Sequence, residues 1–141
     1  MNLADEVLQH LLGDEEVGDH TVLQWSDGRN VAWGAAQRPL CIEAHEQLTA
    51  DGIQARVVSL PCCELFDAQS AEYRESVLPS EVTARVGVEM GVEQGWRKYV
   101  GDHGRFLGMS GFGASAPAGV LLKHFGFTVE NVVATAKAVC G

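Results

Sequence analysis

Residues 55–90 read ARVVSLPCCELFDAQSAEYRESVLPSEVTARVGVEM, and this stretch decides the fold. It opens with an apolar run at about Ala55 to Leu60 and closes with another at about Ala84 to Glu89, and both contain the β-branched valines that favour strands. The segment DAQSAEYRESVLP between them is typical of a helix, which Pro79 ends. A strand, a helix and a second strand in this order predict a βαβ unit with two parallel strands.

The same alternation of strands and helices continues on both sides of this unit. Upstream, two short β-rich runs at 21–25 and 31–35 flank the turn-forming SDGRN and are compatible with a hairpin. We therefore expect an α/β domain whose mostly parallel sheet is covered by helices on both faces. The remaining predicted elements are a helix from about Pro39 to Leu48, a strand at 104–110, a helix from Pro117 to Gly126 and a helix at 128–139 that starts at Thr128 or Asn131.

Two of these helices carry apolar side chains at helical spacing, which predicts the faces that they bury. Cys41 lies on such a face and is therefore expected in the core rather than at a reactive site. The predicted core positions are Leu40, Cys41, Ala44 and Leu48 in the first helix, and Val129, Val132, Val133 and Ala136 in the last.

Composition favours one ordinary domain and excludes several classes of partner. The chain has 141 residues, of which 46% are hydrophobic, and a net charge of -9. This charge argues against nucleic acid and anionic membrane surfaces as partners, because both would repel the chain. The sequence contains no apolar run long enough to span a membrane and does not start like a signal peptide, so we expect a cytoplasmic protein with reduced cysteines.

The first part of the chain is a separate acidic element. Residues 1–19 contain six acidic side chains and no Lys or Arg, and NLADEVLQHLL within them has helical spacing. We therefore divide the chain into an acidic N-terminal helix and linker at 1–19 and an α/β domain at 20–141. The acidic element is either a solvated helix or a docking arm for a basic partner.

Cys62 and Cys63 lie between a predicted strand and a predicted helix, where an α/β enzyme often keeps its chemistry. Adjacent residues on an extended backbone point to opposite sides, so the pair is poorly suited to hold one metal ion, and the redox motif C-x-x-C is absent. Three interpretations remain: core or loop filling, a reactive thiol, and a zinc site completed by His45, His103 or His124. We expect no metal site.

The stretch GFGASA, from Gly111 to Ala116, satisfies G-x-G-x-x-A between a strand and a helix. In a dinucleotide-binding fold this turn occurs early in the domain, whereas here the chain ends soon afterwards. Gly111, Gly113 and Ser115 either form an anion-binding loop or serve tight packing and a helix cap.

Two further places offer candidate functional residues. Glu89 ends an apolar strand at the carboxyl edge, where it acts in a site or accepts hydrogen bonds from a helix start. Trp96, Arg97 and Tyr99 combine a cation with aromatic rings, which is typical of an interface but also of a half-buried surface helix. The motifs H-E-x-x-H, G-x-S-x-G and the P-loop are absent, so the residues alone predict no catalytic site.

Several long motifs resemble the C-terminal domain of transketolase. They are ARVVSLPCCELFDAQSAEYRESVLP, VTARVGVEMG, WRKYVG and GMSGFGASAP followed by LLKHFGFTVENVV, in the order and spacing of that family. The resemblance covers about Asp51 to Val139 and extends more weakly to about Thr21. It implies a three-layer α/β/α domain with a mostly parallel five-stranded sheet, one strand being antiparallel.

The resemblance also implies where the family's chemistry lies. Thiamine diphosphate, its divalent metal and the catalytic side chains belong to two preceding domains and meet across a dimer interface, so no catalytic or cofactor-binding residue transfers to this chain. The sequence departs from the family where relatives read like ATGSE and this chain has AWGAAQRP, and where Cys62 and Cys63 replace Ser and Thr. The replacement of Ser and Thr indicates that this turn requires small residues.

We therefore expect a non-catalytic structural or regulatory domain of a thiamine-diphosphate transferase that acts on sugar phosphates. Met1 followed directly by the acidic helix suggests a separately encoded chain that pairs with the cofactor-binding domains, or a homodimer. The alternatives are a stand-alone module that binds a nucleotide or a phosphorylated metabolite, and an enzyme with Cys62 or Cys63 as its nucleophile.

Overall fold

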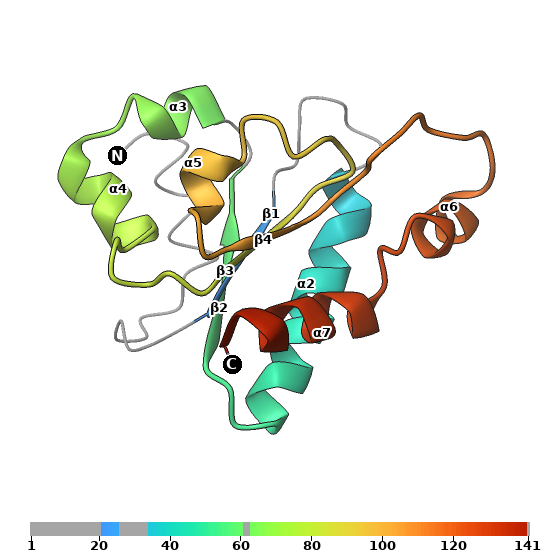
Figure 1. Ribbon diagram of the computed structural model, residues 1–141, viewed down its shortest axis with the longest axis horizontal. Helices are drawn as coiled ribbons and strands as arrows, with labels where there is room; N and C mark the ends of the chain where they lie inside the picture. Colours follow the sequence, from blue (N-terminus) through green and yellow to red (C-terminus); the bar gives the residue numbers. More distant parts are fainter. Residues whose placement is uncertain (1–20, 26–33, 61–62, 141) are drawn as a thin grey trace.

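The computed structural model describes residues 21–25, 34–60 and 63–140, which form four strands and six helices (Figure 1). The predicted acidic helix at 1–19 lies outside the described residues. The strands are β1 (Thr21–Trp25), β2 (Ala55–Ser59), β3 (Arg85–Val88) and β4 (Arg105–Leu107). The helices are α2 (Gly34–Ala50), α3 (Cys63–Asp67), α4 (Ala71–Val77), α5 (Arg97–Val100), α6 (Ala118–His124) and α7 (Val129–Cys140).

The four strands form one parallel sheet in the order β2-β1-β3-β4. In β1, Leu23 pairs with Val57 of β2 on one side and with Val86 of β3 on the other. The prediction of a parallel sheet is therefore confirmed. The expected fifth, antiparallel strand is not among the described residues.

The hairpin predicted from the sequence at 21–25 and 31–35 is wrong in its second strand. Gly34 and Ala35 belong to α2, while 26–33 lie outside the described residues. β1 takes both of its partners from later in the chain, in parallel, which requires a helical crossover rather than a tight turn. Pro39 accordingly lies inside α2, where it has no amide to donate to the preceding turn, and not in the first turn as predicted.

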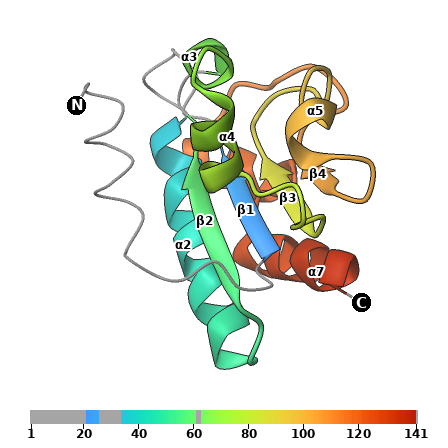
Figure 2. The same ribbon diagram turned by 90° about the vertical axis from the view of Figure 1, so that its left-hand side faces the viewer.

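One face of the sheet is covered by α2 and α7, which lie side by side in both ribbon views (Figures 1 and 2). Val86 and Val88 point to this side because alternate residues of a strand face the same way. All the predicted core positions of α2 and α7 are in this cluster, with Leu40 partly buried at its edge, so the predicted stripes are confirmed. The buried residues are Cys41, Ala44, Leu48, Ala55, Val86, Val88, Phe127, Val129, Val132, Val133 and Ala136.

The opposite face is covered by α3, α4 and α5, which completes three layers (Figures 1 and 2). Gly87 faces this side, and a Cβ atom there would come within 2.9 Å of the Phe106 ring and 3.0 Å of Val100. The missing side chain lets α5 approach the sheet closely. The second cluster consists of Val58, Leu60, Phe66, Val77, Leu78, Val82, Trp96 and Tyr99.

Local capping explains where two of the helices begin. The hydroxyl of Ser70 accepts a hydrogen bond from the amide of Tyr73 at 3.2 Å, so α4 starts there, within the helix predicted at 67–79, and the short α3 precedes that predicted helix. Thr128 caps α7 in the same way, since its hydroxyl accepts from the amide of Asn131 at 3.3 Å. Of the two predicted starts for this last helix, Thr128 is correct.

Candidate functional site

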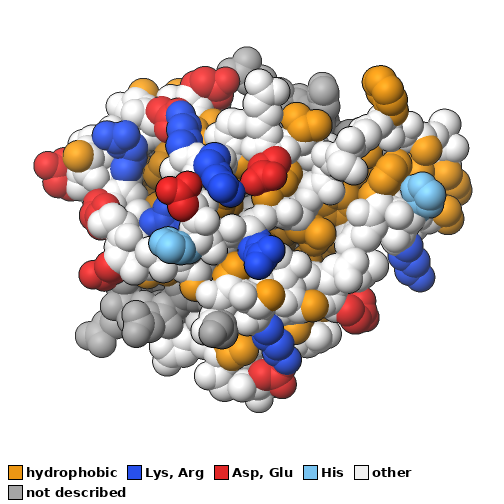
Figure 3. Space-filling model, in the orientation of Figure 1, with side chains coloured by type: hydrophobic (Ala, Val, Ile, Leu, Met, Phe, Trp, Pro, Cys, Tyr) orange, Lys and Arg blue, Asp and Glu red, His pale blue; other side chains and the backbone are white. Residues whose placement is uncertain are grey.

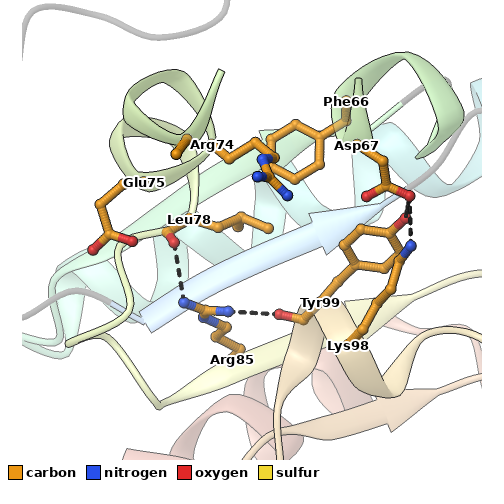
Figure 4. A pocket seen from close by; sticks show the side chains of 9 residues that line it. Phe66, Asp67, Arg74, Glu75, Leu78, Arg85, Lys98 and Tyr99 are labelled. Carbon is orange, nitrogen blue, oxygen red and sulfur yellow. Dashed lines mark hydrogen bonds and ion pairs between the residues drawn. The ribbon is translucent and has the colours of Figure 1, made fainter. Parts of the chain in front are cut away.

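A polar groove opens on the side of the sheet that α3, α4 and α5 cover (Figure 4). It has a volume of about 570 Å³. Its lining mixes three cations and two carboxylates with aromatic and aliphatic side chains, which come from α3, α4, β3 and α5. The lining residues are Phe66, Asp67, Ala71, Arg74, Glu75, Leu78, Arg85, Lys98 and Tyr99.

One side of the groove is a chain of four polar side chains. Lys98 of α5 donates to Asp67 of α3 at 2.5 Å, and the Tyr99 hydroxyl donates to the same carboxylate at 3.0 Å. The Cys63 thiol is hydrogen-bonded to that hydroxyl. The hydrogen bond from Lys98 lowers the pKa of Asp67, and burial followed by the hydrogen bond with Asp67 raises the pKa of Tyr99. These contacts join α3 to α5 across the groove.

Arg85 forms the floor of the groove and is used internally. Its Nε donates to the carbonyl of Val82 at 2.8 Å and its Nη1 to that of Tyr99 at 2.7 Å. Its Nη2 donates to the carbonyls of Pro79 at 2.6 Å and Leu78 at 3.3 Å. One planar guanidinium thus holds the loop before β3 and the end of α5 against each other.

Two charged side chains of α4 complete the groove. Glu75 accepts from both the amide and the hydroxyl of Ser80 at 2.8 Å, and the amide hydrogen bond lowers its pKa. The Arg74 side chain extends over the groove towards Phe66 (Figure 4) and makes no ion pair within the part of the chain that the structure describes.

The groups in the groove are poorly suited to proton transfer near neutral pH. A general acid or base works best when its pKa lies near the operating pH. The pKa values of Asp67 and Glu75 are lowered and that of Tyr99 is raised, so all three move away from neutrality. None of these three shifts therefore moves a pKa towards the range that proton transfer near neutral pH requires.

The surroundings of two described cysteines, Cys63 and Cys41, bear on their proposed roles. Cys63 is half-buried, and desolvation raises the pKa of its thiol above the ordinary 9.0. The raised pKa disfavours a nucleophile at Cys63, because reactive cysteines have lowered pKa values. Cys62 lies outside the described residues. Cys41 is fully buried as predicted, and burial raises its pKa to about 12.

The loop with Gly111, Gly113 and Ser115 connects β4 to α6 and is exposed from Ser110 onward. A Cβ atom on either glycine would meet nothing within 4 Å, so the tight packing that we considered for them is wrong. The N-cap residue of α6 is Pro117, which makes no side-chain capping hydrogen bond, so Ser115 does not occupy the N-cap position. The loop itself contains no Lys or Arg that would attract an anion.

The candidate interface residues lie in different surroundings. Trp96 and Tyr99 are 8% and 5% exposed and belong to the core on the α5 side, where their rings stack edge to face. They cannot serve as surface anchors because this chain already buries them. Arg97 is exposed and forms an ion pair with Glu93 at 3.6 Å. Glu89 is half-buried directly after β3, and its amide donates to Leu107 at 3.1 Å.

The sequence did not reveal the contact between Asp67 and Lys98. The two residues are 31 positions apart, and α5, which carries Lys98, is only four residues long. Their spacing therefore contains no periodic signal that would bring them together.

Metal-binding clusters and membrane-spanning helices are both absent from the described ranges. Within 21–25, 34–60 and 63–140, no three His, Cys, Asp or Glu side chains converge as a metal site would require. Across those same ranges, every helix is too short or too polar to cross a lipid bilayer.

Comparison with known proteins identifies the family. The family model of the transketolase-like TK C-terminal domain matches residues 27–128. Transketolase 1 of Vibrio vulnificus is 54% identical over 120 residues, which are 82% of this chain and 18% of that protein. The chain thus spans about a fifth of the length of this relative.

Solved structures agree with the sequence match. A transketolase from Leishmania mexicana superposes with a TM-score of 0.72 at 45% identity, over 85% of this chain and 16% of that one. A structure described as a split gene transketolase, an inactive beta4 tetramer, has the same fold with a TM-score of 0.60 at 19% identity, over 87% of this chain and 40% of that one. The family model covers most of the α/β domain, and the chain therefore belongs to the transketolase family, as its C-terminal domain.

Proposed function

We propose that this chain is the non-catalytic structural C-terminal part of a transketolase-like enzyme, which transfers two-carbon ketol units between sugar phosphates. The observation that carries the proposal is the match at 54% identity to only 18% of a transketolase. The chain thus corresponds to one segment of that relative, and most of the relative's length lies outside the match.

The described residues do not fit the cofactor of that enzyme. Thiamine diphosphate is held through a divalent metal, which needs several oxygen ligands at one place. The residues that the structure describes bring no such set together. We therefore assign thiamine diphosphate and its metal to the other domains of the assembled enzyme.

The partner that we propose is the polypeptide with the cofactor-binding domains, either in a separate chain or in a longer form of this one. The split-gene transketolase, which shares the fold, makes a separate chain reasonable. A homodimer, a cytoplasmic location and a docking role for the acidic residues 1–19 remain predictions, as does a fifth, antiparallel strand.

The alternative of a stand-alone binding module is not favoured. It rested on the loop with Gly111, Gly113 and Ser115, which is exposed and has no cation of its own. The family match also supplies a simpler reason for the GFGASA motif, namely descent from transketolases.

A chimeric enzyme tests the proposal. In the Vibrio vulnificus transketolase, the matching C-terminal segment is replaced by residues 21–141 of this chain, and ketol transfer is measured. We expect an active enzyme, and we expect the isolated 141-residue chain to bind no thiamine diphosphate with magnesium in calorimetry. Cofactor binding or turnover by the isolated chain, or a soluble but inactive chimera, would contradict the proposal.

A further inference from the structure

The polar groove between α3, α4 and α5 carries one positive charge that its own lining does not balance (Figure 4). Its charged lining residues are the cations Arg74, Arg85 and Lys98 and the carboxylates Asp67 and Glu75. Lys98 forms an ion pair with Asp67 at 2.5 Å. Glu75 and Arg85 lie close enough to attract each other. Arg74 is therefore the cation that has no carboxylate of its own among the lining residues.

The Arg74 guanidinium is free to bind a ligand. The residue is exposed, and its side chain makes no hydrogen bond or ion pair with any residue that the structure describes. Its charge reaches into the groove, since the pKa of Asp67, lowered mainly by the hydrogen bond from Lys98, is lowered further by Arg74. Lys and Arg side chains gather over α4 and α5 in Figure 3, although the whole chain has a net charge of -9.

The groove also has an apolar wall that could hold the body of a ligand. Phe66, Leu78 and Tyr99 line it and are 8%, 8% and 5% exposed, so the core fixes their positions. The rings of Phe66 and Tyr99 meet edge to face with their centroids 6.1 Å apart. A further flat ring can pack against them in the same manner. The volume of about 570 Å³ lies within the range of about 300–1,000 Å³ that is typical of small-molecule sites.

We propose that this groove binds a small organic monocarboxylate with an aromatic body. The planar guanidinium of Arg74 holds the carboxylate through two parallel hydrogen bonds, and Phe66 and Tyr99 contact the ring. Charge selects a carboxylate over a phosphate monoester. One negative charge matches the one unbalanced cation, whereas a phosphate carries about -1.5 to -2 at neutral pH and would also face Asp67 and Glu75.

This inference does not depend on the proposed function, because the isolated 141-residue chain tests it. The isotope-labelled chain is titrated with 3-phenylpropionate near neutral pH and followed by NMR. We expect saturable shifts of the Arg74 Nε resonance and of amides in the groove lining, with a Kd of about a millimolar, which is ordinary for so small a ligand. About 1 M NaCl should weaken binding by about threefold or more, because salt screens the exposed guanidinium.

Three related compounds separate the contributions of charge and ring. Acetate keeps the carboxylate without the ring, and 3-phenylpropionamide keeps the ring without the charge. Each should bind at least about tenfold more weakly than 3-phenylpropionate, because each loses one of the two contacts. The third compound, 2-phenylethyl phosphate, keeps the ring and carries more negative charge, and it should bind about threefold more weakly or worse.

Variants identify the residue that binds the carboxylate. Arg74→Gln should weaken binding of 3-phenylpropionate by about tenfold or more, and Arg74→Lys should give an intermediate Kd because an ammonium lacks the planar fork. Arg105→Gln is the matched control, since Arg105 is an exposed arginine on β4 that does not line the groove. Arg74→Gln should leave the urea midpoint of unfolding unchanged, which shows that the variant folds.

The possible outcomes test each part of the proposal. Absence of saturable shifts up to about 20 mM 3-phenylpropionate, or equal losses of binding in Arg74→Gln and Arg105→Gln, would overturn the site. Tighter binding of 2-phenylethyl phosphate would overturn the monocarboxylate as the ligand class. Saturable shifts that are confined to residues outside the groove would overturn its location.

Discussion

Replacing Arg85 by Met should destabilise the domain by about 3 kcal/mol. The guanidinium donates to the carbonyls of Val82, Tyr99 and Pro79 at 2.8, 2.7 and 2.6 Å. An ordinary hydrogen bond contributes about 1 kcal/mol net, and we use this value rather than the about 1.5–3 kcal/mol of charged groups because Arg85 is only half-buried. Met has a similar length and keeps the apolar stem, so the loss reflects the three hydrogen bonds and the carbonyls left without a donor.

Urea denaturation followed by circular dichroism measures the effect as a change in the free energy of unfolding. Arg105→Met is the matched control, because Arg105 is an exposed arginine on the neighbouring strand and its loss should cost less than about 0.5 kcal/mol. Arg85→Lys should fall between the two, since an ammonium cannot reproduce the planar fork. If Arg85→Met and Arg105→Met unfold at the same urea concentration, the role assigned to Arg85 is wrong.

Three further predictions concern other parts of the domain. Asp67→Asn should destabilise the protein at neutral pH. Folding lowers the pKa of Asp67 below 3.8, so the carboxylate stabilises the folded state above pH 3.8, and this effect is lost as the pH falls through the lowered pKa. The urea midpoints of the variant and the original protein should therefore converge in acid, and a constant difference between them would refute the assignment. Gly87→Ala should lower the free energy of unfolding by about 1–3 kcal/mol, because the new methyl group would lie 2.9 Å from the Phe106 ring. Gly111→Ala is the control, since Gly111 has open space around it, and it should change the free energy of unfolding by less than about 0.5 kcal/mol. Equal effects of the two substitutions in urea denaturation would contradict this prediction. In a Cys62→Ala variant, iodoacetamide should modify Cys63 more slowly than the exposed Cys140 at neutral pH, because burial raises the pKa of the Cys63 thiol. Mass spectrometry measures the two rates. Faster modification of Cys63 than of Cys140 would support the reactive-thiol hypothesis.

Much of the parallel sheet could be predicted because its signals are local. The predicted strands over 55–60 and 84–89 were observed at Ala55–Ser59 and Arg85–Val88, since buried parallel strands need continuous β-branched runs. The apolar stripe of α7 was likewise confirmed, with Val132 and Ala136 fully buried. A helix that covers a sheet must show this spacing in its sequence.

The errors occurred where partners far along the chain decide the outcome. Gly34 and Ala35 have strand-like neighbours in sequence, but the pairing of β1 with β2 and β3 leaves them in a helix. Trp96 and Tyr99 combine aromatic rings with nearby cations, as an interface would, yet both are buried in the core on the α5 side, where Trp96 lies against Gly87. Composition does not distinguish an aromatic residue that is buried by its own chain from one that awaits a partner.

The sequence by itself determined the α/β class, the family and the faces that α2 and α7 bury, because hydrophobic periodicity and long motifs are properties of neighbouring residues. Only the tertiary structure decided which polar and aromatic residues meet, as when it joined Asp67 to Lys98 and left Phe112 fully exposed. The physical reason is that side-chain burial and the pKa shifts it causes depend on distances in space, and folding brings together residues whose separation in sequence contains no repeat.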